Sequence, residues 1–376
     1  MKMKFSRRDL LAASAAAATS LPLMSRRTSA RRADVLDDSM FVKEAQYYEK
    51  LGGGAVRCTL CPHECEVIDM ERGTCSVREN RGGTYYTLVH SRVCSWGVDP
   101  IEKKPLFHFL PGTRAFSIAT AGCNMECKFC QNWQISQFRP EDVNNRYWPP
   151  DRVVELAKIN GCPSIAYTYS EPVVFYEYMY DTAVVGRKEG VRSAIITNGF
   201  INREPIVELC KVLDAVKVDL KAFTEKFYRE TCGGVLKPVL DALKWIKETG
   251  IWLELVVLIV PTLNDTKDEI RKMSDWVCSE LGPGVPMHFS RFHSTYRIKN
   301  LPETPRTTLE MARETAVAAG IQFAYIGNVP MHPFENTYCP KCGELLIQRV
   351  RYTTAVIALR DGKCTKCRAE IPGVWS

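Results

Sequence analysis

Residues 115–133 read AFSIATAGCNMECKFCQNW and decide the fold of this chain. An apolar stretch of strand length is followed at once by Cys123, Cys127 and Cys130. Thiolates hold iron–sulfur clusters, usually four of them per cluster. Three cysteines in eight residues therefore indicate a cubane with one iron left open to a small molecule. The alternative is a structural zinc site with a distant fourth ligand, although zinc cysteines normally come in Cys-x2-Cys pairs.

Strand-like and helix-like segments alternate from Phe116 to about Asn328. Apolar runs of strand length recur at 116–119, 164–168, 194–197, 215–220, 253–259, 287–290 and 322–326. Strand, helix and strand repeated in this way predict an α/β fold with a parallel sheet, as a partial or complete (β/α) barrel. Active sites of such barrels form at the carboxyl ends of the strands. The three-cysteine loop falls at one of those ends.

Two further cysteine clusters flank this region, and together the three clusters hold most of the sixteen cysteines. The first contains Cys58, Cys61, Cys65 and Cys75. Four thiols so close in sequence indicate one metal centre, either zinc or an auxiliary iron–sulfur cluster, with a disulfide pair as the third alternative.

The last cluster pairs Cys339 and Cys342 with Cys364 and Cys367. Two Cys-x2-Cys knuckles are typical of a ribbon around one tetrahedral ion, with zinc the first choice. An iron site of the rubredoxin kind has the same ligands, so iron stays open.

These clusters divide the chain into four parts: a signal segment at 1–30, a module at 31–110, the barrel at 111–335 and a zinc-ribbon-like or rubredoxin-like module at 336–376. In the second part an amphipathic helix is expected from about Asp38 to Leu51, before the four-cysteine cluster. Gly52 to Gly54 follow it, and glycine stops helices.

The 376-residue chain has a formal net charge of +7, and residues 1–30 contribute a net +5 to this value. The remainder is nearly neutral, which argues against nucleic acid as a partner. Arg7 and Arg8 precede a short apolar stretch and resemble a twin-arginine export signal. The segment favours export to the periplasm, and the alternative is a basic leader on a cytoplasmic protein. No segment is long and apolar enough to be a transmembrane helix.

The motifs also resemble a known family. The runs CTLCPHEC, DPIEKKPLFHFLPG, TAGCNMECKFCQNWQIS, AYTYSEP, ITNGF, VKVDLKAF, MHFSRFH, YIGNV and YCPKCG occur in this order. Together they look like the AmmeMemoRadiSam system radical S-adenosylmethionine enzymes, which are related to pyruvate formate-lyase activating enzymes. The resemblance extends from about residue 41 to the end of the chain.

The resemblance implies roles for individual residues. Cys123, Cys127 and Cys130 would hold a [4Fe–4S] cluster, and S-adenosylmethionine would chelate the open iron. Its other contacts would come from the backbone of Phe129 and from the side chains of Glu171, Asn198 and Lys221. Activases carry Gly-Gly-Glu where this chain has Tyr169, Ser170 and Glu171, so the close backbone approach of the two glycines is in question.

The implied activity is reductive cleavage of S-adenosylmethionine to a 5'-deoxyadenosyl radical, which abstracts hydrogen from a substrate that the sequence does not identify. An electron donor is then required, and Memo-like and AMMECR-like proteins are implied as partners. The alternative is a metal-stabilised, cysteine-rich binding or adaptor protein without radical chemistry.

Overall fold

A parallel sheet forms the centre of the computed structural model, which describes residues 37–351 and 353–376. Its parallel strands are β9 (Arg114–Ala119), β11 (Ser164–Tyr167), β12 (Arg192–Thr197), β13 (Ala215–Asp219), β14 (Trp252–Ile259), β15 (Met287–Arg291) and β16 (Ala324–Gly327). The predicted α/β fold is therefore confirmed. The long apolar runs reflect strands buried on both faces.

The sheet is open. Its eight strands run in the order β16-β15-β14-β13-β12-β11-β9-β8, and β8 (Ser95–Pro100), which the sequence analysis did not predict, pairs antiparallel with β9. The strands β8 and β16 are thus the two edges of the sheet, and they do not pair with each other to close a barrel.

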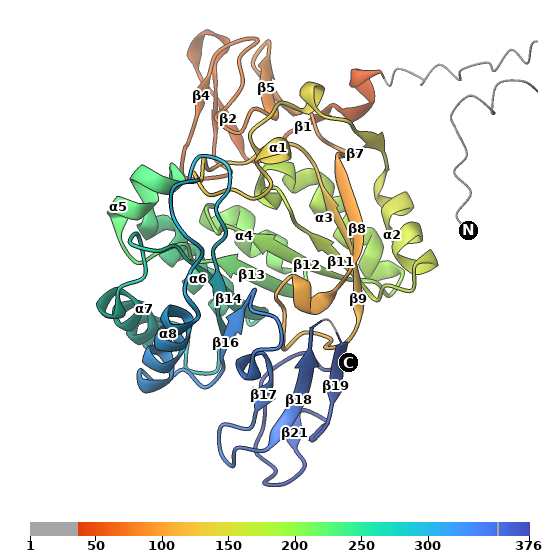
Figure 1. Cartoon of the computed structure of the whole chain (residues 1–376). Helices are drawn as coiled ribbons and strands as arrows, with labels where there is room; N and C mark the ends of the chain where they lie inside the picture. Colours follow the sequence, from red (N-terminus) through yellow and green to blue (C-terminus); the bar gives the residue numbers. More distant parts are fainter. Residues whose placement is uncertain (1–36, 352) are drawn as a thin grey trace, which may run out of the picture. The chain divides into compact units, whose positions relative to one another are not determined.

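Helices connect the parallel strands (Figure 1). They are α1 (Trp133–Ser136), α2 (Pro150–Ile159), α3 (Tyr176–Lys188), α4 (Arg203–Cys210), α5 (Glu225–Phe227), α6 (Leu236–Glu248), α7 (Lys267–Glu280) and α8 (Arg306–Ala318). A π-helical turn, η6 (Tyr228–Cys232), follows α5. Each connection returns the chain to the amino end of the next parallel strand, so the loops after the strands gather at the carboxyl ends.

The prediction of a helix from about Asp38 to Leu51 is wrong. A single 3-10 turn, η1 (Asp38–Phe41), is followed by β1 (Lys43–Glu44) and β2 (Tyr48–Lys50). Phe41, Ala45 and Tyr48 have helical spacing, but the backbone pairs elsewhere, with β1 against β6 and β2 against β3. The backbone N–H and C=O groups of β1 and β2 form hydrogen bonds in sheets instead of in a helix. Local periodicity does not reveal such pairing, because it depends on the partner strands.

The rest of the amino-terminal module is built from short strands: β3 (Val56–Cys58), β4 (Glu66–Val67), β5 (Arg78–Arg81), β6 (Thr84–Thr87) and β7 (Arg92–Val93). β10 (Arg146–Tyr147) pairs with β7. The carboxyl-terminal ribbon contains β17 (Thr337–Tyr338), β18 (Leu345–Val350), β19 (Thr353–Val356), β20 (Leu359–Arg360) and β21 (Lys363–Cys364).

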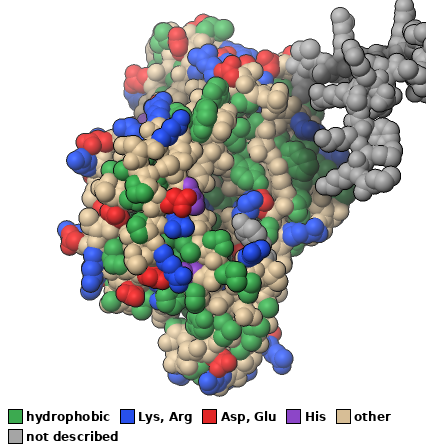
Figure 2. Space-filling view, in the orientation of Figure 1, with side chains coloured by type: hydrophobic (Ala, Val, Ile, Leu, Met, Phe, Trp, Pro, Cys, Tyr) green, Lys and Arg blue, Asp and Glu red, His purple; other side chains and the backbone are tan. Residues whose placement is uncertain are grey.

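The surface mixes charges of both signs. Lys and Arg side chains are interspersed with Asp and Glu on the face drawn in Figure 2. In the part of the chain that the structure describes, no helix has both the length and the apolar character needed to cross a membrane. The twin-arginine-like segment at 1–30 lies outside the described residues.

Candidate functional site

The three-cysteine loop leaves β9 at its carboxyl end, as predicted. Gly122 begins the loop with a φ of +97°, a conformation that glycine adopts without strain. Within the loop, the amide of Cys130 donates to the carbonyl of Cys127 at 3.0 Å, and the amide of Met125 donates to Sγ of Cys123 at 3.4 Å. The loop backbone therefore fixes the direction of the thiols.

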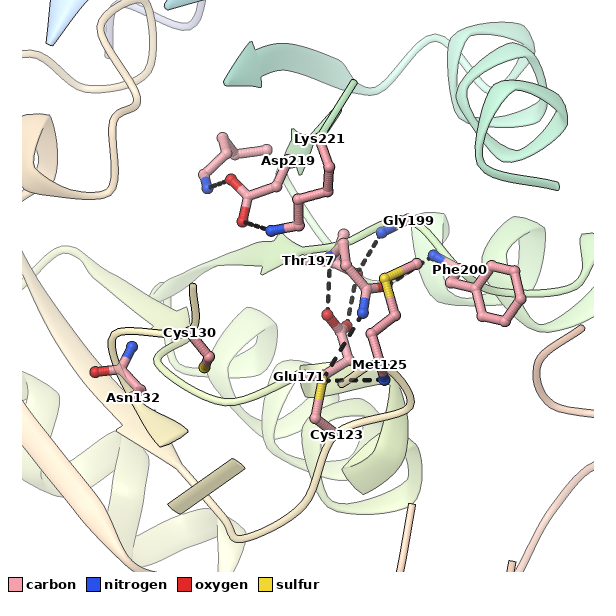
Figure 3. Close-up of polar contacts among 12 residues, drawn as sticks. Cys123, Met125, Cys130, Asn132, Glu171, Thr197, Gly199, Phe200, Asp219 and Lys221 are labelled. Carbon is pink, nitrogen blue, oxygen red and sulfur yellow. Dashed lines mark hydrogen bonds and ion pairs between the residues drawn. The ribbon is translucent and has the colours of Figure 1, made fainter. Parts of the chain in front are cut away.

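All seven residues predicted to hold the cluster or S-adenosylmethionine line one pocket of about 750 Å³ at the carboxyl ends of the parallel strands. These residues are Cys123, Cys127, Phe129, Cys130, Glu171, Asn198 and Lys221. They come from the ends of four strands, and Figure 3 shows Glu171 lying between Cys123 and the end of β12. The structure thus brings together residues that are far apart in the sequence.

Glu171 is buried and bound by three protein donors. Its Oε1 accepts from Thr197 Oγ1 at 2.6 Å and from the amide of Val173 at 3.1 Å, and its Oε2 accepts from the amide of Asn198 at 2.8 Å. Burial raises the pKa of Glu171 to about 7 despite these bonds. A carboxylate has about four acceptor positions, so one remains for a ligand in the pocket.

Of Tyr169 and Ser170, which stand at the expected Gly-Gly position, only Tyr169 has a glycine-like backbone. Tyr169 has a φ of +68°, which is uncommon for a residue with a side chain. Its hydroxyl donates to Asp99 Oδ2 at 2.6 Å, and its ring lies 4.6 Å from the Lys104 ammonium. Ser170 Oγ donates to the carbonyl of Thr120 at 2.7 Å. Both side chains are thereby held by protein partners.

A charged cluster lies at the end of β13. Lys221 Nζ lies 2.9 Å from Asp219 Oδ2, and Lys217 pairs with the other carboxylate oxygen. Although burial opposes it, the two ammonium groups hold the pKa of Asp219 well below its usual range. Lys217 was not among the predicted site residues. It lies two residues before Asp219, and strand periodicity places both side chains on one face.

Two other residues at the loop were missed as well. Cys232 in η6 is fully buried and hydrogen-bonds to Cys127, which lowers the pKa of the Cys127 thiol. The carbonyl of Cys232 also accepts the amide of Glu126 at 2.8 Å. Asn124 donates to the carbonyl of Phe200 at 2.7 Å and accepts from Asn198 at 2.8 Å. Neither residue belongs to a spacing pattern, so only the folded structure reveals them.

The ribbon cysteines converge on one point. Cys339 and Cys367 lie 3.5 Å apart, Cys342 and Cys364 lie 3.7 Å apart, and all four sulfurs are within 4.8 Å of one another. A tetrahedral ion with metal–sulfur bonds of about 2.3 Å places its ligands about 3.8 Å apart. The ribbon therefore has the geometry of a site for a single ion.

The four amino-terminal cysteines, Cys58, Cys61, Cys65 and Cys75, line a second, smaller pocket. Cys65 Sγ lies 3.4 Å from Thr74 Oγ1. The disulfide alternative has no support among the described residues, because all of their cysteines are free thiols.

Comparison with known proteins identifies the fold family. Residues 117–277 match the Radical SAM superfamily, and the match begins within β9 and includes the three-cysteine loop. The chain belongs to the Radical SAM superfamily. An uncharacterized protein of Methanocaldococcus jannaschii, MJ0808, is 47% identical over 327 residues, which cover 87% of this chain and 97% of that protein.

Two other proteins are similar to this chain at lower sequence identity. The pyruvate formate-lyase 1-activating enzyme of Escherichia coli strain K12 is 25% identical over 173 residues, covering 44% of this chain and 69% of that enzyme. Among solved structures, Streptococcus suis SuiB bound to S-adenosylmethionine aligns over 64% of this chain and 56% of that chain, with 13% identity and a TM-score of 0.46.

Membership of the superfamily implies a [4Fe–4S] cluster and S-adenosylmethionine. The residues of the pocket fit both groups. Unlike the ribbon sulfurs, Cys123, Cys127 and Cys130 do not form a convergent group of ligands for one ion among the described residues. Such spacing suits three separate irons of a cubane better than one ion. In the same pocket, Glu171 offers an acceptor for the amino group of an amino acid ligand, and Lys221 offers a positive charge for its carboxylate.

Proposed function

We propose that this protein reductively cleaves S-adenosylmethionine and uses the radical to abstract hydrogen from a substrate, as activating enzymes do. One observation carries the proposal: the three-cysteine loop and the four predicted S-adenosylmethionine contacts line one pocket. Cys123, Cys127 and Cys130 would hold the cluster. When bound, cluster and S-adenosylmethionine supply a 5'-deoxyadenosyl radical.

The residues of the pocket orient the ligand. Glu171 accepts a hydrogen bond from the methionine amino group through its remaining acceptor position. Lys221, held 2.9 Å from Asp219, offers its positive charge to the methionine carboxylate. Asn198 and the backbone of Phe129 contact the ribose and adenine. Phe129 is 5% exposed and packs 5.9 Å from the Phe227 ring, so this part of the pocket excludes water.

The same family resemblance extends the proposal to partners and metals. The ordered motifs resemble AmmeMemoRadiSam system enzymes, so Memo-like and AMMECR-like proteins are the proposed partners, besides an electron donor. The ribbon takes one zinc ion through its four converging thiols. The pocket has no assigned substrate.

The test is formation of 5'-deoxyadenosine by anaerobically purified protein under strong chemical reduction. Wild type is expected to release it slowly without substrate, whereas Cys123→Ala, Cys127→Ala and Cys130→Ala each abolish release because two thiolates do not retain the cluster. Cys278→Ala, on α7 away from the pocket, is the matched control and retains activity. Cluster-loaded wild type that never forms 5'-deoxyadenosine would support the adaptor alternative.

We also propose that the protein is exported through its twin-arginine-like segment. The guanidinium pair of Arg7 and Arg8 is the feature that a receptor would read. Replacing both with lysine keeps the charge and is expected to hold the protein in the cytoplasm. An unchanged distribution after cell fractionation would argue for a cytoplasmic protein with a basic leader.

A further inference from the structure

The amino-terminal four-cysteine pocket differs from the ribbon in the spacing of its thiols. The four ribbon sulfurs lie within 4.8 Å of one another, but among the described residues no three of Cys58, Cys61, Cys65 and Cys75 form such a convergent group. The cysteines of the three-cysteine loop do not form one either. Sulfurs that share one ion converge, whereas ligands of a cluster bind separate irons and stand apart.

A buried cation accompanies these thiols. Arg78, which is 1% exposed, lines the pocket and pairs with Glu177 at 2.5 Å. Its Nε is buried and has no hydrogen-bond partner. A cluster with a 2+ core and four thiolates has a net charge of about −2, and hydrogen bonds to sulfur tune such clusters. The charge of Arg78 is already paired with Glu177, but its Nε is an unused donor at the pocket that these thiols line.

The pocket lies directly against the three-cysteine loop. His63, which lines it, bonds through Nε2 to the carbonyl of Asn124 at 2.7 Å. A methyl group on Gly122 would lie 2.9 Å from the carbonyl oxygen of Cys75. The amino-terminal module therefore contacts the loop on both sides of Cys123.

The contact continues into the larger pocket. Asn124 lines the four-cysteine pocket, and its side chain accepts from Asn198 Nδ2 at 2.8 Å. The same Nδ2 lies 4.0 Å from Cys123 Sγ. A short series of bonded and packed groups thus joins the two cysteine sites.

We propose that Cys58, Cys61, Cys65 and Cys75 hold a second iron–sulfur cluster. This cluster transfers single electrons to the cluster at Cys123, Cys127 and Cys130. A low-potential one-electron carrier protein reduces the second cluster. That cluster returns to its oxidised state as it passes the electron to the first, and no bond forms or breaks in this transfer. The inference rests on the proposed function, which requires such an electron.

The first test counts metals in anaerobically reconstituted full-length protein. More than four irons per chain, with matching sulfide and one zinc, is expected. Cys61→Ser/Cys65→Ser removes the excess iron, whereas Cys123→Ala/Cys127→Ala/Cys130→Ala retains it. The matched control Cys278→Ser changes neither count. Four irons and two zinc ions in wild type would overturn the proposal, and that measurement does not depend on how the variants fold.

The second test measures contact between the clusters by electron paramagnetic resonance of the fully reduced protein. Spin coupling is expected to broaden or split the wild-type spectrum, and both multiple variants lose the effect. A wild-type spectrum equal to the sum of the two variant spectra would overturn the proposal that electrons pass between the two clusters.

The two proposals fail in different ways. Protein with four irons and two zinc ions that still forms 5'-deoxyadenosine defeats the second cluster alone. Protein with two coupled clusters that never forms 5'-deoxyadenosine defeats the proposed function alone.

Discussion

Glu171 joins structure and ligand binding in one side chain. It caps η5 (Pro172–Phe175) through the amide of Val173 and holds the end of β12 through Thr197 and Asn198. A helix-start role and a ligand role would exclude each other only if every acceptor position of the carboxylate were already taken. The geometry makes them compatible, since three donors leave one acceptor position unused.

The raised pKa of Glu171 predicts pH-dependent binding of S-adenosylmethionine. Because burial raises this pKa to about 7, the carboxyl is mostly protonated at pH 6 and mostly ionised at pH 7.5. The ionised form accepts the stronger hydrogen bond, so affinity is expected to fall as the pH falls, by up to about eightfold over this range. Titration calorimetry of cluster-loaded, unreduced protein measures it.

Glu171→Gln provides the control for this prediction. Glutamine keeps an acceptor but does not ionise, so its affinity is expected to be weaker and nearly independent of pH between 6 and 7.5, with the iron content unchanged. A variant with the wild-type pH profile would assign the titration to another group.

Cys232 is expected to tune the cluster without holding it. It bonds to Cys127, and losing one hydrogen bond worth about 1 kcal/mol at a ligand sulfur lowers a one-electron potential by about 40 mV. Cys232→Ala is therefore expected to release 5'-deoxyadenosine and to show a more negative potential in a redox titration. Cys210→Ala, another buried thiol, is the control. Loss of the cluster in Cys232→Ala would instead identify a fourth ligand.

At the scale of elements, the regular repeat was predictable and the irregular contacts were not. The seven parallel strands and the chemistry at their ends follow from apolar runs and the residues after them, because strand and loop are adjacent in the sequence. The antiparallel strand β8 and the strands at Lys43–Glu44 and Tyr48–Lys50 depend on pairing with β9, β6 and β3, and the position of Cys232 depends on its contact with Cys127. Local periodicity contains no information about those partners.

The contact between the amino-terminal module and the loop predicts a sensitive glycine. A methyl group on Gly122 would lie 2.6 Å from Val77 Cγ1 as well as close to Cys75, at a φ of +97°. Gly122→Ala is expected to destabilise the protein by about 2–5 kcal/mol, from overpacking and backbone strain together. Anaerobic thermal unfolding measures the change.

Gly190 offers a matched control for that substitution. It has a φ of +72° at the end of α3, and no heavy atom lies within 4 Å of the added methyl group. Gly190→Ala therefore includes only the backbone strain, about 1–2 kcal/mol. Equal losses of stability in the two variants would show that the loop and module separate without cost.

At the scale of the whole molecule, the ribbon is part of the pocket. Arg349 and Arg351 of the ribbon line the same pocket as the three-cysteine loop. Arg349 donates to the carbonyl of Phe107 at 2.8 Å, and its guanidinium lies 4.1 Å from the Phe107 ring. The ribbon and sheet also share an apolar cluster that includes Cys339 and Cys364, so the proposed metal site is packed against the sheet.

Removing the ribbon metal is therefore expected to open the pocket while leaving the loop cluster in place. Cys339→Ser/Cys342→Ser leaves two thiols, which do not hold zinc tightly, and metal binding supplies much of the folding free energy of such a small module. We expect loss of one zinc per chain, a lower unfolding temperature and proteolytic cleavage after about residue 336, with iron content and basal 5'-deoxyadenosine formation largely retained. Lys341→Ser, inside the same knuckle but without a ligand atom, is the matched control and keeps the zinc. Protease resistance and an unchanged unfolding temperature in the zinc-free double variant would mean that packing on Phe107 and Tyr325 folds the ribbon without a metal.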